Sequence, residues 1–306
     1  MKRYAYIDMT YQELRNLDRE KTIVFSSISP VETHGPHLPL GTDIYIAETL
    51  RDRIIERIGE IHPDYHALIL PTLPFGAGAI PVEGSIKVSH RAVHQVVLDT
   101  GKTLSDLGFT YWILTDNHGD PFHGIAIETA SRKLAKKGFH LIAPFNLTFR
   151  YMVGHHPELM ELTKLGPGKC GDVSDSHAGA NETSLMLASY PDKVRDNWTS
   201  VGPSKTSPMK FFSKYLSAIS TMLKIMGAKD ASLDYYFMAT GLAWISDPEM
   251  VPYRGNPSLA SIESGESMYH YQVEVAVKLF ENAYSGNRQY TKLIGWSVRF
   301  LRHLMP

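Results

Sequence analysis

Short apolar runs typical of buried β-strands alternate, in the first half of this chain, with longer segments of helical periodicity. The strand-like runs cover residues 22–28, 66–70, 109–114 and 139–143, and helical patterns cover residues 43–58, 89–107 and the stretch that ends near residue 137. Strands that alternate with helices of about ten residues or more favour a mainly parallel sheet covered by helices on both faces. The pattern therefore predicts an α/β fold, and the absence of a linker segment predicts one domain over residues 1–306.

The loop between the first predicted strand and the next helix carries an unusual density of metal-binding side chains. Within residues 30–43 it places Glu32, His34, His37 and Asp43 among two glycines and three prolines. Glycine and proline bend or restrict the backbone, so we expect a stiff loop with its side chains in fixed positions. A loop that only reverses the chain needs no such set of carboxylates and imidazoles.

Two further loops bring candidate ligands toward the same place. His118 and Asp120 follow the strand-like run 109–114 directly, and His177 and Glu182 stand where a later helix begins. In parallel sheets, bound molecules and ions lie beyond the carboxyl ends of the strands. These loops should therefore share one edge of the sheet with Glu32. Oxygen and imidazole ligands without thiolates suit Zn²⁺ or Mn²⁺. Their number exceeds the need of one tetrahedral ion and predicts two divalent metal ions that share a carboxylate and activate a water.

Each candidate also has a simpler structural interpretation. Asp43 could cap a helix, and Glu182 and Asp120 could be acidic side chains at the first turn of a helix. His37 is interpreted as a buttress of the loop, and Cys170 as an incidental thiol. The joint position of the candidates at one sheet edge favours the metal site over these separate roles.

The composition excludes several classes of partner. The 306 residues contain 31 Lys and Arg against 32 Asp and Glu, a net charge of −1, which points to neither nucleic acid nor an anionic membrane. No apolar run reaches the length of about 18 residues that a membrane helix needs, and the first residues contain no apolar segment of a secretory signal. A single cysteine fits a reducing compartment, so we expect a cytoplasmic protein.

The candidate ligands lie in segments that resemble one known family. Residues 32–43 resemble the E-x-H-G-x-H-L-P-x-x-T-D signature of the creatininase (creatinine amidohydrolase) family. In the same order, residues 116–119 are similar to its N-G-H-G segment, residues 177–184 match its H-A-G-x-x-E-T-S, and residues 255–266 resemble its late G-D-P segment. The resemblance extends over about residues 23–280.

The resemblance implies a doubly covered α/β sheet and two divalent metal ions, Zn²⁺ or Mn²⁺ or both. Glu32, His34, Asp43 and His118 would be ligands, with Asp43 bridging the ions. Members of the family are typically homo-oligomers, often hexamers. They hydrolyse cyclic or linear amides such as creatinine, formamides of opened purines or peptide bonds of a modified precursor, and one branch opens a carbocyclic sugar ketone.

The chain also departs from the family pattern. After His118, most members continue with Gly-Gly-Asn, and creatinine-opening enzymes carry a glutamate ligand in that segment, whereas this chain has Asp120. Asp120 could bind a metal with its shorter side chain, and if it does not reach, Glu182 is the remaining carboxylate. No tryptophan stands near His177 to enclose creatinine, which argues against that substrate. Residues of about 205–247 are interpreted as a helical insertion.

The sequence thus predicts a dinuclear metal-dependent amidohydrolase that acts on a C–N bond, other than a peptide bond, of a small-molecule amide. His177 and Glu182 are predicted to be catalytic, His177 by stabilising the oxyanion or protonating the leaving nitrogen. Gly84, Ser85 and Asp175 are predicted to bind substrate.

Two alternatives remain. A catalytically silent member would use the site only to bind a metal or a small molecule, and the departure at Asp120 motivates this alternative. Phosphoester hydrolysis would call for basic residues near the ligands, and residues 32–43 and 177–182 contain no Lys or Arg.

Overall fold

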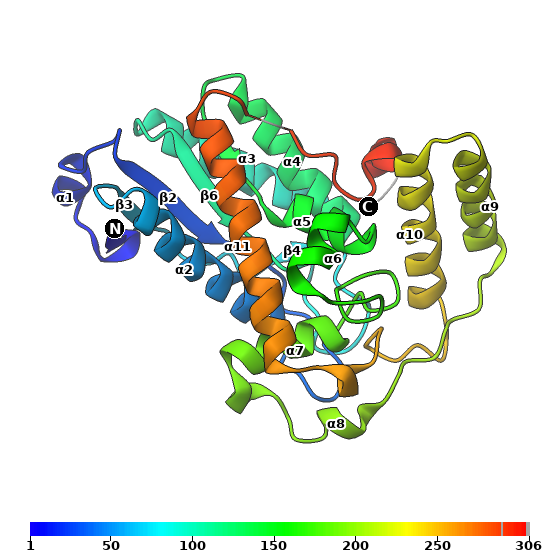
Figure 1. Cartoon of the computed structure of the whole chain (residues 1–306). Helices are drawn as coiled ribbons and strands as arrows, with labels where there is room; N and C mark the ends of the chain where they lie inside the picture. Colours follow the sequence, from blue (N-terminus) through cyan, green and yellow to red (C-terminus); the bar gives the residue numbers. More distant parts are fainter. Residues whose placement is uncertain (289, 304–306) are drawn as a thin grey trace.

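A five-stranded parallel sheet forms the centre of the molecule (Figure 1). The computed structural model describes residues 1–288 and 290–303 of the chain. All pairings between neighbouring strands of this sheet are parallel, which confirms the prediction of a mainly parallel α/β sheet. In their order across the sheet, the strands are β1 (Lys2–Ala5), β3 (His66–Ile69), β2 (Thr22–Ser27), β6 (Tyr111–Thr115) and β7 (His140–Ile142).

Helices cover both faces of the sheet. Successive residues of a strand point to opposite faces, and in β2 the fully buried Ile23 and Phe25 join one hydrophobic core while Val24 joins the other. The first core is shared with α2 (Thr42–Ile61), α7 (Ala180–Ser189) and α11 (Ile262–Tyr284). The second is shared with α3 (His90–Asp106) and α4 (Pro121–Ala135). Because β2 is buried from both sides, its carboxyl end is held rigidly, and this end leads into the loop with Glu32.

The first strand was not predicted from the sequence. β1 lies at the edge of the sheet and pairs only with β3. Its residues are mostly exposed, so it has neither the continuous apolar run nor the strict alternation by which a strand is recognised. The other four strands of this sheet begin and end within two residues of the predicted bounds.

The remaining elements connect or flank these layers. They are the helices α1 (Tyr11–Arg15), α5 (Phe145–Val153), α6 (Pro157–Thr163) and α8 (Trp198–Val201), the short strand pair β4 (Gly76–Ala77) and β5 (Lys87–Val88), and the 3₁₀ turns η1 (Tyr6–Asp8), η2 (Pro191–Lys193), η3 (Pro257–Leu259) and η4 (Trp296–His303). In the described part of the chain, no helix combines the length and the apolar character that a membrane span requires.

A pair of helices, α9 (Phe211–Ile225) and α10 (Lys229–Ile245), stands at one side of the sheet layers (Figure 1). The two helices are tied together by Ser220 and Ser232, whose hydroxyls each donate to the other residue's carbonyl oxygen. The apolar run 235–245, which has no clear role in the sequence, forms most of α10. The interpretation of residues 205–247 as an insertion stays a prediction.

The contact between α11 and α7 allows a test of the packing near the candidate site. A Cβ atom on Gly265 would lie 2.1 Å from the carbonyl oxygen of Ser184, so Gly265→Ala would force the two helices apart. We expect this variant to lower the free energy of unfolding by about 1–3 kcal/mol in urea denaturation, as overpacked cores do, although alanine is the better helix former.

Gly241→Ala in α10 is the matched control, because a Cβ atom there meets nothing within 4 Å. This change should be neutral or raise stability by up to about 1 kcal/mol. Equal stability of the two variants would contradict the close approach of α11 to α7.

Candidate metal centre

Glu32, His34 and Asp43 come from the loop that joins β2 to α2. The amide of Glu32 donates to the carbonyl oxygen of Leu40 (2.9 Å) and closes the loop on itself. Gly35 has φ +65°, a left-handed conformation that glycine adopts without strain, and donates its N–H to Pro252 (2.7 Å). These bonds direct the three side chains inward, and each is at most 1% exposed.

His118 comes from the loop after β6, the strand next to β2. The carboxylate of Asp116 fixes this loop because one of its oxygens accepts from the Ser29 hydroxyl and from the amides of Asn117 and His118 (2.8–3.0 Å). Ser29 follows β2, so Asp116 joins the ends of the two neighbouring strands. The two loops therefore meet at one sheet edge.

Glu182 lies in the first turn of α7 and reaches the same place. Ala178, two residues before this helix, has φ +47°, a conformation that costs free energy in a residue other than glycine and is found at functional sites. In this conformation its N–H donates to Glu182 Oε2 (2.5 Å). The strained backbone thus holds the carboxylate in position.

These side chains form two groups of candidate ligands that share Asp43. In the first, His118 Nδ1 lies 3.1 Å from Glu32 Oε2 and 3.6 Å from Asp43 Oδ2. In the second, His34 Nε2 lies 3.3 Å from Asp43 Oδ1 and 3.6 Å from Glu182 Oε2. Within each group the ligand atoms all lie within 4.8 Å of one another, and His177 forms a third group with Glu32 and His34.

Each of the two histidines directs one ring nitrogen to a carbonyl oxygen and the other to the carboxylates. His34 Nδ1 lies 3.0 Å from the carbonyl oxygen of Glu32, and His118 Nε2 lies 2.8 Å from that of Ala77. A carbonyl oxygen only accepts, so these nitrogens carry protons, while His34 Nε2 and His118 Nδ1 face the carboxylates and could bind a metal ion on loss of a proton. Metal-bound histidines are oriented in this manner.

Several atoms of the cluster are buried without a hydrogen bond. Among the described residues, Glu32 Oε2, His34 Nε2 and Asp43 Oδ2 have no hydrogen-bonding partner. Such burial is costly for a polar atom unless another group satisfies it. All three converge on the shared space, so the residues fit divalent metal ions.

The electrostatics of the cluster point to bound cations as well. Burial opposes protonation of His34, but Asp43 and Glu182 outweigh it and raise its pKa to about 10. Burial raises the pKa of Glu182 to about 7, and Asp43 and Glu32 add to this although His34 opposes it. Three carboxylates crowded into a buried space attract positive charge, and metal ions would supply it.

A comparison with known proteins places this arrangement in a family. The family model described as creatinine amidohydrolase matches residues 7–280. The chain belongs to the creatininase family. Its membership confirms the resemblance seen in the motifs.

Curated relatives and solved structures agree with this membership. The chain is 25% identical over 183 residues to a mycofactocin precursor peptide peptidase of Mycolicibacterium smegmatis, covering 59% of this chain and 63% of that protein. It is 26% identical over 182 residues to a creatinine amidohydrolase of Pseudomonas putida, covering 56% and 66%. The matches thus span less than two thirds of these relatives.

Two solved structures share the fold. One is titled "Creatininase Mn" and the other is a creatininase variant of "Zn-Zn type"; both have a TM-score of 0.60 and 21% identity. The first covers 92% of this chain and 99% of the creatininase chain, and the second covers 91% and 97%. At this identity the likeness concerns the fold.

The structure does not bring Asp120, a predicted ligand, into any group of candidate ligands. Its side chain caps α4 by accepting from the amide of His123 (2.8 Å) and packs against Gly78, where a Cβ atom would lie 2.1 Å from the carboxylate carbon. Of the two carboxylates that the sequence left open for the second ion, Glu182 is the one that lies with His34 and Asp43.

The predicted substrate-binding residues support the loops around the cluster. Ser85 accepts from the amide of Thr33 (3.2 Å), and Gly84 packs beside Leu40. Asp175 is 1% exposed, and its two oxygens accept from the backbone amides of Ala180 and Asn181 at the start of α7 and from that of Gly171 in the loop before it. These contacts do not support a substrate-binding role for Asp175, which stays a prediction, as it does for Gly84 and Ser85.

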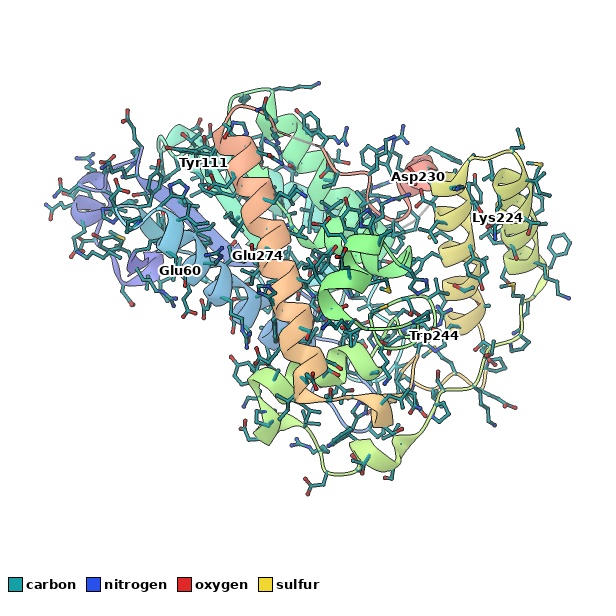
Figure 2. The ribbon with its side chains drawn as sticks, in the orientation of Figure 1. Glu60, Tyr111, Lys224, Asp230, Trp244 and Glu274 are labelled. Atoms are coloured by element: carbon teal, nitrogen blue, oxygen red, sulfur yellow. The ribbon has the colours of Figure 1, made fainter. Side chains whose placement is uncertain are left out.

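Two residues near the cluster were not singled out from the sequence. Asn117 donates from Nδ2 to both Asp43 Oδ1 and Glu182 Oε1 (2.9 Å each) and thereby ties the ligands together. Its position beside His118 is the only signal that the sequence offers. Trp244 of α10 lies with its ring 5.5 Å from that of His177, and no sequence signal links residues so far apart (Figure 2 marks Trp244 near the end of α10).

A fourth group of potential ligands, His155, Cys170 and Asp172, has its polar atoms satisfied. Asp172 Oδ2 accepts from the Cys170 thiol (3.4 Å) and from the amide of Gly168 (2.6 Å), and lies 3.0 Å from His155 Nε2. Burial raises the pKa of Cys170, and the charge of Asp172 adds to this. The thiol therefore stays protonated, which agrees with the interpretation of Cys170 as an incidental thiol.

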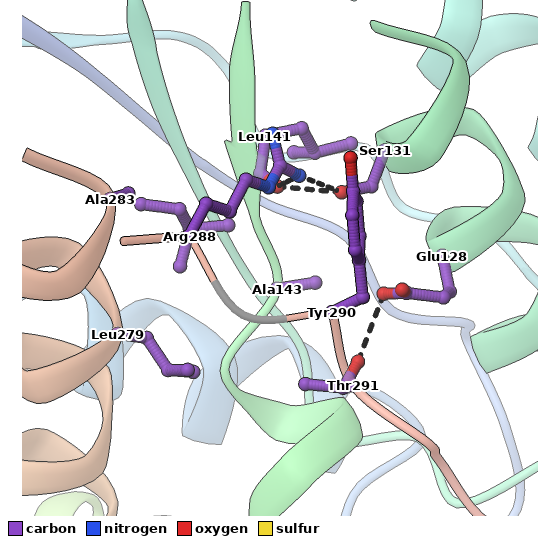
Figure 3. Close-up of a pocket in the computed structure, with 10 residues that line it drawn as sticks. Glu128, Ser131, Leu141, Ala143, Leu279, Ala283, Arg288, Tyr290 and Thr291 are labelled. Atoms are coloured by element: carbon purple, nitrogen blue, oxygen red, sulfur yellow. Dashed lines mark hydrogen bonds between the residues drawn. The ribbon is translucent and has the colours of Figure 1, made fainter. Parts of the chain in front are cut away.

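The pocket in Figure 3 lies apart from the candidate ligands and contains none of them. Arg288 donates there to the Ser131 hydroxyl and to the carbonyl oxygen of Leu141 (2.5 and 2.9 Å), and the Thr291 hydroxyl donates to Glu128 (2.9 Å). These bonds fasten the C-terminal segment to α4 and β7. We interpret the pocket as part of the structural contact between the C-terminal segment and the elements α4 and β7.

The sharing of Asp43 predicts which substitutions remove metal. Asp43→Asn should lose both ions per chain, because both groups need its charge, whereas Glu182→Gln should lose one and keep the other. The measurement is metal content by mass spectrometry after dialysis, with Cys170→Ser as a control that retains both ions. Unchanged metal content in Asp43→Asn would rule out a shared ligand.

Asn117 should act through the ligands that it positions. We expect Asn117→Ala to weaken binding of the ion held by Glu182 by about 10–100-fold, the usual effect of removing such a partner, without loss of the fold. Titration with Zn²⁺ or Mn²⁺ measures the affinity, and circular dichroism checks the fold. Wild-type affinity in this variant would show that the two hydrogen bonds do not position the ligands.

Proposed function

We propose that this protein is a metal-dependent amidohydrolase that hydrolyses a C–N bond of a small-molecule amide. Two divalent ions, Zn²⁺ or Mn²⁺, would be held at the candidate centre, and the shared carboxylate of Asp43 is the observation that carries the proposal. The residues that would hold them are Glu32, His34, Asp43, His118 and Glu182. Such a pair lowers the pKa of a water and polarises a carbonyl group.

His177 is suited to move a proton at this centre. Its Nε2 donates to the carbonyl oxygen of Thr33 (2.8 Å), which leaves Nδ1 unprotonated. Burial, together with the neighbouring His34, lowers the pKa of His177 to about 4, so the ring is neutral at pH 7. A neutral imidazole with a free nitrogen accepts a proton and can return it to the leaving nitrogen. This extends the role as proton donor that the sequence predicts.

The contacts of Glu182 favour a role as a metal ligand over a role as a general acid or base. Its Oε1 accepts from Asn117 and its Oε2 from Ala178, while Oε2 also lies 3.6 Å from His34 Nε2. A carboxylate held from two sides is oriented for a metal ion and has little freedom to follow a reacting proton. We therefore assign proton transfer to His177 and metal binding to Glu182.

The named relatives leave the choice of amide open. One is a peptidase of a precursor peptide and another a creatinine amidohydrolase, so amide hydrolysis is common to both names. We propose a small-molecule amide rather than a peptide as the substrate of this chain. Location in the cytoplasm and assembly into homo-oligomers, hexamers in the family pattern, remain predictions.

The test is a screen of lactams, formamides and short peptides with the Zn²⁺- or Mn²⁺-loaded protein. With the substrate found, His177→Ala should lower kcat by about 10²–10⁴-fold, the usual contribution of a general acid–base group, while metal content stays at the wild-type level. His155→Ala, in the satisfied group outside the centre, is the control with unchanged kcat. Full turnover by His177→Ala would refute the role of His177, and a loaded protein inactive on every amide would refute the proposal.

A further inference from the structure

Residues 251–255 form one wall of the candidate centre. Pro252 accepts the N–H of Gly35, and Arg254 forms an isolated antiparallel bridge with His177. In this bridge each residue donates to the other: His177 N to Arg254 O (3.3 Å) and Arg254 N to His177 O (2.6 Å). Directly paired residues of antiparallel segments have their side chains on the same side. The side chain of Arg254 therefore leaves the backbone on the side of the His177 ring.

That side faces the metal ligands. The His177 ring lies 4.3 Å from the ring of His34, and His177 forms a group of candidate ligands with Glu32 and His34. Trp244 of α10 also lies near His177, and its indole N–H donates to the carbonyl oxygen of Val251 (3.1 Å), which ties the helix to residues 251–255. The backbone of Arg254, the ring of Trp244 and the ring of His34 are thus all neighbours of His177.

Arg254 has no counter-charge at ion-pair distance. Among the described residues, no carboxylate is paired with its guanidinium, whereas the half-buried Arg150 pairs with both Asp230 and Asp234. Burial lowers the pKa of Arg254 to about 10, and Tyr236 and Asp172 act against this. The carboxylate of Asp172 already accepts from Gly168, Cys170 and Ser174. A partly desolvated cation without a partner is costly unless a bound group pairs with it.

Once metal is bound, the carboxylates of the centre do not act as the counter-charge of Arg254. Two divalent cations carry more positive charge than Glu32, Asp43 and Glu182 carry negative charge, so no excess of negative charge remains for Arg254 to balance. A single guanidinium matches the two oxygens of a carboxylate well. No second Arg or Lys stands beside Arg254 in residues 251–258 or in the ligand loops 32–43 and 177–182, as a phosphate group would call for.

We propose that Arg254 binds a carboxylate of the substrate, so that the amides cleaved at this centre are amides that carry a free acid group. This inference rests on the proposed amide hydrolysis and narrows its substrate class. Trp244 provides an aromatic surface beside the same space, suited to a planar amide or ring. Arg254 is thus a specificity-determining residue.

The test is binding to the metal-loaded protein by calorimetry, which needs no turnover. The probes are hippurate, N-acetylglycine and pyroglutamate, each paired with its primary amide. We expect at least one acid to bind about tenfold or more tightly than its amide, as a charge-assisted bond to a guanidinium provides. Arg254→Met should abolish this preference with the affinity for the amide unchanged, and Arg254→Lys should keep part of it.

Arg15→Met is the matched control, because Arg15 lies exposed in α1, far from α10, and should retain the full preference. Thermal melting checks that the Arg254 variants fold. A preference that survives in Arg254→Met would show that the metal ions bind the acid, and no preference for any acid would equally overturn the inference. If inorganic phosphate binds in a manner that depends on Arg254 and the acids do not bind, the position is a phosphate site, and the inference is overturned.

The outcomes separate this inference from the proposed function. An Arg254-dependent preference in a protein that hydrolyses none of the amides would support the binding site and refute the hydrolase. Hydrolysis of neutral amides at equal rates in wild type and Arg254→Met would support the hydrolase and refute the acid-binding role.

Discussion

The buried carboxylate of Asp43 is the constraint on which the candidate site depends. It is 1% exposed, begins its helix beside the end of β2, and lies between His34 on one side and His118 on the other. Burying a carboxylate is costly unless cations and hydrogen bonds compensate it. Asn117 supplies one such hydrogen bond, and the two groups of ligands meet at this carboxylate. Any change in the spacing of the strand ends would separate them.

The fold maintains the spacing of the strand ends because the elements that carry the candidate ligands are packed rigidly against their neighbours. β2 and β6 are adjacent and buried on both faces, and Asp116 fastens their carboxyl ends together through Ser29. The third contributor, α7, is held by the close approach of α11 at Gly265. Three segments that are distant in sequence thereby keep their side chains within a few ångströms, which a flexible loop alone would not achieve.

Much of the architecture, and most of the side chains that the structure brings together at one sheet edge, could be predicted from the sequence. The apolar runs of the central strands and the loop 32–43 carry strong local signals, and the parallel arrangement follows from their alternation with helices. The edge strand β1 was missed because its exposed residues have no such signal. Asp120 was expected among the ligands, but a carboxylate one residue before a helix is readily occupied by the local amide of His123, and the sequence cannot decide between these partners.

The sequence by itself determined which chemical groups are present and which strand ends carry them, because periodicity and loop composition are local properties. Only the tertiary structure decided that Asn117 bridges Asp43 and Glu182, that Trp244 of α10 lies beside His177, and that Arg254 pairs along the backbone with His177. These relations depend on how distant segments pack and on which hydrogen bonds satisfy each buried atom. Such choices are made by the whole fold, and no single segment of the sequence contains them.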